Sequence, residues 1–220
     1  MMVRTKLALP AKFQISNKRI WAPLMPYITI GVGLLVLHNA WITILSYHLG
    51  MILILMFSKG RVSLRTIYEN GNYKILIGSA VLGGTGGLLL YLLWPLLGIP
   101  VDIDLYLQKI GLTTAVWPYF IAYYILINPW LEEYYWRSYL GSNSKRITLN
   151  DLLFSGYHIL VLAGKINVIW LITVFILLSL AGWFWRQANR WNRGLAPSII
   201  SHIAADASVI LTIYFMTSRI

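Results

Sequence analysis

The sequence predicts an all-α protein, a polytopic transmembrane helical bundle of seven or eight membrane helices. Composition is the first reason, because 58% of the 220 residues are hydrophobic and only 11% are charged, with a mean hydropathy of +0.68. Soluble domains carry about 25% charged residues. The second reason is pattern, because apolar runs close to the roughly 20 residues that a membrane helix needs recur along the chain.

The N-terminal half contains three of the expected spans. They cover residues 21–37, 40–57 and 75–97. The first follows the basic segment KFQISNKRI, and the second is somewhat short for a membrane crossing. The third contains a GxxxG pattern at Gly83 and Gly87, which permits close approach of two helices, and we interpret it as packing.

Four further spans are expected in the C-terminal half. They cover residues 113–136, 152–163, 168–185 and 195–216. Residues 105–110, in the loop before the first of them, predict a short interfacial helix. Pro197 suits the start of the last helix, because the first turn does not need its missing N–H.

The positions of the basic residues predict the orientation. With the N-terminus in the cytoplasm, fifteen of the eighteen Lys and Arg residues fall in cytoplasmic segments, and only Lys109, Lys165 and Arg219 fall outside. This is the asymmetry of the positive-inside rule. The formal net charge of +11 therefore indicates attraction to anionic lipid rather than to nucleic acid. The chain has no cysteine, which excludes disulfides and thiolate chemistry.

Few ionisable residues lie within the spans, and such residues are costly enough to suggest function. They are His38, His48, Glu132, Glu133, His158, His202 and Asp206. We interpret the first two as structural or interfacial. The other five lie on three different spans, at depths that the loop charges place near the same side of the membrane.

The stretch NPWLEEYYWRSYLG places two acids side by side at the end of the fourth span. Glu133 and Arg137 are four residues apart, the spacing of an ion pair on one helix face. Glu132 is rotated by about 100° from Glu133, so it is left without that partner. A desolvated carboxylate of this kind suits a general base.

The fifth and seventh spans carry the histidines. Phe154 and His158 share one helix face, and so do His202 and Asp206. A Glu, two His and an Asp can activate water and stabilise an oxyanion. Two His and one Glu also form a known zinc set, but HExxH is absent and no motif predicts a metal.

These residues form three short motifs in order: EExxxR, FxxxH and HxxxD. Together they resemble the CPBP (ABI) family, which includes type II CAAX prenyl proteases, bacteriocin-processing proteins and self-immunity proteins. The resemblance covers about residues 110–216, whereas residues 1–100 resemble nothing identified. It implies an intramembrane protease whose cavity opens to the cytoplasm. The residues themselves require no cofactor, and zinc remains an alternative that no motif supports.

The resemblance also implies roles for the site residues. Glu132 would be the general base and His158 would orient the same water. His202 and Asp206 would stabilise the oxyanion. The supporting residues would be Glu133, Arg137 and Phe154. The eukaryotic prenyl proteases carry Asn where this chain has Asp206, which accepts hydrogen bonds when ionised and would hold His202 in its charged form.

We therefore expect a basic cytoplasmic segment at 1–20, N-terminal membrane helices at 21–100 and a catalytic membrane core at 101–220. The expected partners are the lipid bilayer and a peptide or lipidated protein substrate, and the expected location is a prokaryotic plasma membrane. The sequence leaves the oligomeric state open. It also leaves two alternatives, a non-catalytic immunity or scaffold protein and an ion or proton transporter.

Overall fold

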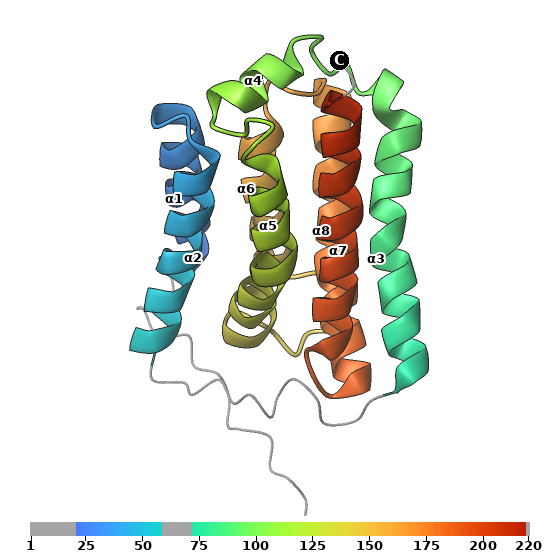
Figure 1. Cartoon of the computed structure of the whole chain (residues 1–220). Helices are drawn as coiled ribbons and strands as arrows, with labels where there is room; N and C mark the ends of the chain where they lie inside the picture. Colours follow the sequence, from blue (N-terminus) through green and yellow to red (C-terminus); the bar gives the residue numbers. More distant parts are fainter. Residues whose placement is uncertain (1–20, 59–71, 219–220) are drawn as a thin grey trace, which may run out of the picture.

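The computed structural model describes residues 21–58 and 72–218, and within these ranges the chain forms a bundle of helices without strands (Figure 1). The predicted basic segment at 1–20 lies outside the described residues. In chain order the elements are η2 (Ala22–Leu24), α1 (Met25–Ile30), η3 (Gly31–Val36), α2 (Ala40–Phe57), α3 (Tyr73–Leu93), η5 (Trp94–Leu96), α4 (Ile103–Lys109), α5 (Trp117–Glu132), η6 (Glu133–Tyr139), α6 (Leu149–Leu162), α7 (Val168–Asn192) and α8 (Ala196–Thr217).

Four of the described helices are long and apolar enough to cross a membrane: α2, α3 with η5, α7 and α8. The shorter apolar helices 22–36 and 149–162 lie beside them, together with α5 (Figure 1). The predicted all-α membrane bundle is thus confirmed. The predicted boundaries need adjustment, because α7 continues to Asn192 rather than ending at residue 185.

Side-chain caps decide where several helices begin. The Asn39 side chain accepts a hydrogen bond from Ile42 N at 3.0 Å before α2, and Asn167 does the same for Trp170 N at 3.2 Å before α7. A reciprocal capping box precedes α6. These caps satisfy backbone donors that the first turn leaves free. Local sequence therefore sets where these three helices begin.

The loops gather at two ends of the bundle, as the loop charges predict. At one end, Ala40 N donates to Ile110 O at 2.8 Å and Asn167 N donates to Leu97 O at 2.9 Å. At the other end, the Arg186 guanidinium donates to the carbonyls of Ser142 and Ser144. The two sets alternate along the chain, so the helices cross the bundle in alternating directions (Figure 1).

Helix α3 packs at one edge of the bundle against α8 (Figure 1). The two glycines of the GxxxG pattern make this contact. A Cβ added at Gly83 would overlap the backbone oxygen of Ser201, and one added at Gly87 would overlap that of Ser208. The backbone N–H of Gly87 also donates to Ser208 Oγ at 3.0 Å. The predicted packing role of the pattern is confirmed.

Candidate active site

The two adjacent acids lie where the backbone changes its helical form. α5 continues through Pro129 to Glu132, and the π-helix η6 begins at Glu133. Proline cannot donate a backbone hydrogen bond, and π-helical turns are frequent at functional sites. Both carboxylates are buried, with Glu132 2% exposed and Glu133 0% exposed. The chain thus holds two acids inside the bundle at one end of α5.

The ring of His202 joins these acids to α8. Its Nδ1 lies 2.9 Å from Glu133 Oε1. Its Nε2 lies 3.4 Å from Asp206 Oδ1 and 3.7 Å from Glu132 Oε2. The ring also stacks on Trp185, with 4.7 Å between ring centroids. Three of the predicted site and supporting residues, Glu132, Glu133 and Asp206, therefore meet at the imidazole of a fourth, His202.

Arg137 neutralises part of this negative charge. Its Nε lies 3.4 Å from Glu133 Oε2, so the predicted ion pair is present. The guanidinium lies 4.0 Å from the ring centroid of Phe154 and 5.0 Å from that of Trp185. Both distances are within the range of cation–π interactions, so the two rings help to hold the cation in place. Glu133 therefore has two partners, Arg137 and His202, where the sequence predicted only the first.

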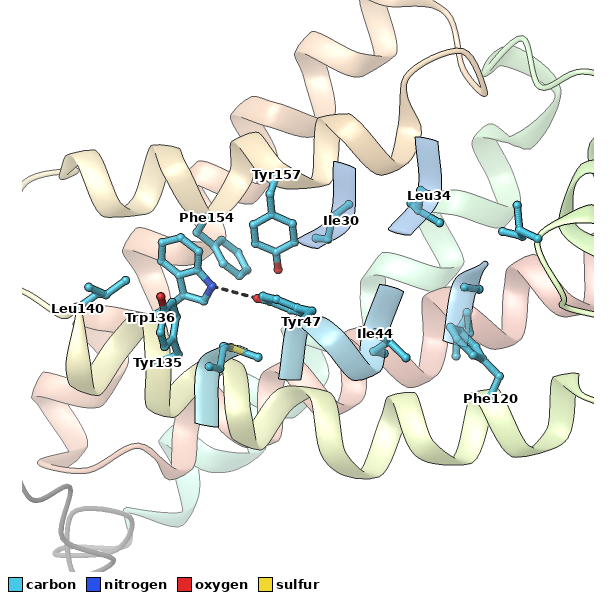
Figure 2. Packing of buried hydrophobic residues seen from close by; sticks show 14 of the residues in the cluster. Ile30, Leu34, Ile44, Tyr47, Phe120, Tyr135, Trp136, Leu140, Phe154 and Tyr157 are labelled. Carbon is cyan, nitrogen blue, oxygen red and sulfur yellow. Dashed lines mark hydrogen bonds between the residues drawn. The ribbon is translucent and has the colours of Figure 1, made fainter. Parts of the chain in front are cut away.

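Two tyrosine hydroxyls hold one oxygen of Glu132. The hydroxyls of Tyr47 and Tyr157 donate to Oε1 at 2.9 Å and 2.6 Å. The indole N–H of Trp136 donates to the Tyr47 hydroxyl at 3.3 Å, and Figure 2 shows the Tyr157 hydroxyl directed into the same space. The other oxygen, Oε2, is buried and makes no hydrogen bond. Glu132 is thus fixed at one oxygen and free at the other.

His158 lies at the edge of this cluster. Its ring stacks on Tyr157 with 4.1 Å between centroids, and its Nδ1 lies 2.9 Å from the backbone oxygen of Phe154. Because a carbonyl only accepts, Nδ1 carries the proton and Nε2 of the neutral ring is an acceptor. Among the described residues, His158 forms no hydrogen bond or ion pair with Glu132 or His202. The ring of Phe154 contacts both histidines, at centroid distances of 5.0 Å and 6.3 Å.

The cluster continues through residues that the sequence did not indicate. Asn128 Nδ2 donates to Asp206 Oδ2 at 2.9 Å. Asn128 Oδ1 lies 3.0 Å from His48 Nε2, and His48 Nδ1 lies 2.8 Å from the Tyr123 hydroxyl. His48 is only 2% exposed, so of the two interpretations given for it, structural or interfacial, its burial supports the structural one. No pattern distinguishes these side chains from other polar residues in apolar runs, because their role depends on how α2 packs against α5.

The described residues contain no group of three or more His, Asp or Glu side chains arranged to hold a metal ion. The groups that converge on His202 are carboxylates already engaged with Arg137, Asn128 and the two tyrosines.

Residues 114–208 match the model of a protein family described as type II CAAX prenyl endopeptidase Rce1-like. This part of the chain is therefore similar to that family, and the match supports the resemblance seen in the sequence motifs. The matched range contains every predicted site residue from Glu132 to Asp206. At the family level the match supports a CAAX-type intramembrane protease. Helix α2, which contributes Tyr47 and His48, lies outside the matched range, and comparisons with curated proteins and with solved structures found no match.

Proposed function

We propose that this protein is an intramembrane endopeptidase in which Glu132 activates a water molecule that attacks a peptide carbonyl. The observation that carries the proposal is the asymmetry of Glu132. Two tyrosines donate to Oε1, whereas Oε2 is buried, accepts no hydrogen bond and lies 3.7 Å from His202 Nε2. A carboxylate held at one oxygen and free at the other is suited to accept a proton from water.

His158 gives this water a second partner. Its Nε2 is an acceptor and forms no hydrogen bond among the described residues, because Nδ1 donates to the carbonyl of Phe154. A water that donates one proton toward Glu132 and the other toward His158 has a lone pair directed away from both. Stacking on Tyr157 keeps the His158 ring in one orientation.

His202 supplies the stabilisation of the tetrahedral intermediate. Both of its nitrogens face carboxylates, so it donates from both only as the charged imidazolium. Attack by water converts the substrate carbonyl into an oxyanion, and His202 Nε2–H, 3.7 Å from Glu132 Oε2, is the donor that we assign to it. When the carbon–nitrogen bond breaks, the proton taken up by Glu132 passes to the leaving amine. The products are a carboxylic acid and an amine, and no covalent enzyme intermediate forms.

The substrate we propose is a peptide or a membrane-tethered protein with a lipidated end. The membrane-spanning helices and the CAAX-type family support a substrate that reaches the site from the bilayer surface. The distribution of basic residues supports a cytoplasmic N-terminus and a site opening on the same side. A prokaryotic plasma membrane is the location we propose.

The test is hydrolysis in liposomes. Purified protein is incubated with matched peptides that differ only in a prenyl group, and the products are identified by mass spectrometry. We expect wild type to cleave one of them and Glu132→Gln to lower kcat by about 100-fold or more, as for removal of a general base. Gln still accepts the tyrosine hydroxyls at its amide oxygen, so the fold is kept.

Cleavage by Glu132→Gln at the wild-type rate would show that the proposed mechanism is wrong. Peptide binding by wild type without cleavage, unchanged in Glu132→Gln, would instead favour the non-catalytic immunity or scaffold alternative. His158→Gln and His202→Gln complete the series, with lower kcat expected for both.

A further inference from the structure

We propose that His48 and Asn128 are positioning residues that hold Asp206 against His202 through one continuous line of hydrogen bonds. The proposal deepens the peptidase function above and rests on it for its catalytic meaning. It assigns a role in the site to helix α2, which lies outside the residues that match the family. The line of hydrogen bonds itself is a property of the folded chain and can be tested without a substrate.

The line connects three helices. It runs from Tyr123 on α5 to His48 on α2, back to Asn128 on α5 and then to Asp206 on α8, over 2.8, 3.0 and 2.9 Å. His48 and Asn128 are each 2% exposed, and Asp206 is 9% exposed. Buried polar groups that have no water to replace a lost partner depend on such bonds.

Only one arrangement of donors satisfies the line. An ionised Asp206 can only accept, so Asn128 turns its NH2 group toward Asp206 and its carbonyl toward His48. His48 must then donate from Nε2, and Nδ1 of the neutral ring accepts the Tyr123 hydroxyl proton. His48 therefore decides which way the amide of Asn128 points, and the amide decides which oxygen of Asp206 remains for His202.

The catalytic consequence is a competition for one proton. His202 Nε2–H faces Asp206 Oδ1 at 3.4 Å and Glu132 Oε2 at 3.7 Å. With Oδ2 of Asp206 tied to Asn128, Oδ1 stays directed at the imidazole. Without the hydrogen bond from Asn128, we expect His202 Nε2–H to donate to Glu132 Oε2 instead. That oxygen is then no longer available to accept a proton from water. Asn128 thus keeps the base free.

A reversed pair tests the central bond. In Asn128→Asp, two carboxylates face each other and the bond is lost. In the double variant Asn128→Asp with Asp206→Asn, the amide at 206 donates to the carboxylate at 128, and its carbonyl accepts from His202. The total charge is that of wild type. We expect Asn128→Asp to lower kcat by at least about tenfold, and the double variant to recover most of that loss.

NMR of the histidine ring nitrogens tests the same line of hydrogen bonds and requires no substrate cleavage. The chain has four His residues, so selective 15N labelling gives four ring spin systems, each assigned by substituting one histidine. We expect His48 to be protonated at Nε2, and the His202 Nε2 signal to move in Asn128→Asp and to return in the double variant. His202 signals that are the same in all three proteins would overturn the proposal, as would a double variant no more active than Asn128→Asp.

Two variants at His48 test the same proposal independently, should Asn128→Asp fail to fold. His48→Gln keeps an N–H donor near the position of Nε2, whereas His48→Met has similar length and no donor. We expect His48→Gln to retain at least about fivefold more kcat than His48→Met, with little difference in KM. Equal kcat values for the two would contradict a positioning role. Should wild type cleave no peptide, the proposed function fails, and the NMR result still decides the hydrogen-bonded line.

Discussion

Glu133 Oε1 lies 2.9 Å from His202 Nδ1, so the second of two adjacent acids orients the imidazole that the first one faces. Glu133 also pairs with Arg137 at 3.4 Å. The two carboxylates therefore act on opposite nitrogens of one ring. Glu133 fixes the ring, which leaves Nε2 for Asp206, Glu132 and the substrate.

Substitution of Glu133 separates its two contacts. In Glu133→Gln the amide oxygen still accepts from His202 Nδ1, but the charge that pairs with Arg137 is gone, whereas Glu133→Ala loses both. Hydrogen bonds to charged groups contribute about 1.5–3 kcal/mol, so we expect kcat to fall about tenfold in Glu133→Gln and further in Glu133→Ala. Steady-state kinetics in liposomes measure this. Equal kcat values for both variants and wild type would exclude the orienting role.

Loss of Arg137 should destabilise the fold. Arg137→Met keeps much of the side-chain length between Phe154 and Trp185, but removes one of the two cationic partners of the fully buried Glu133 and leaves only His202. Removing one partner of a buried pair costs about 3–5 kcal/mol. Reversible unfolding in detergent micelles gives the free energy, and Lys145→Met, at an exposed position, is the matched control. Equal losses in the two variants would contradict this account.

The two tyrosines should act together on Glu132. Tyr47→Phe and Tyr157→Phe each leave one hydroxyl on Oε1, whereas the double variant leaves that oxygen bare inside the bundle. We expect each single variant to lower kcat severalfold and the double variant to lower it by more than the product of the two, because contacting residues are non-additive. Tyr119→Phe, whose side chain is 73% exposed, should match wild type. Simple additivity would show that the hydroxyls act independently.

The α3–α8 contact predicts that alanine substitution at Gly83 destabilises the protein, whereas the same substitution at Gly84 does not. A Cβ at Gly83 meets the backbone of Ser201, the residue before His202, whereas one at Gly84 meets nothing within 4 Å. Overpacking of this kind costs about 1–3 kcal/mol. Gly83→Ala should therefore lower the melting temperature in detergent and also lower kcat, and Gly84→Ala should do neither. The same melting temperature for both would show that α3 can shift without cost.

Much of the fold follows from local features of the sequence. The apolar runs predicted where helices lie, and the alternating loop charges predicted which loops share an end. The asparagine caps and Gly83 with Gly87 are equally local, because a cap or a close helix approach depends on residue type and spacing. The errors concern helix ends, as at Asn192, where the polar face of α7 carries the helix past the end of its apolar run.

The sequence by itself predicted that Glu132, two histidines and Asp206 lie on three apolar helices near one end of the bundle, in a pattern that resembles CAAX-type proteases. Tertiary structure decided which atoms meet. It brought Glu133 to His202 as well as to Arg137, set Tyr47 and Tyr157 on one oxygen of Glu132, and made His48 and Asn128 neighbours of Asp206. Spacing along one helix predicts contacts within that helix, whereas these contacts depend on how α2, α5, α6 and α8 pack side by side.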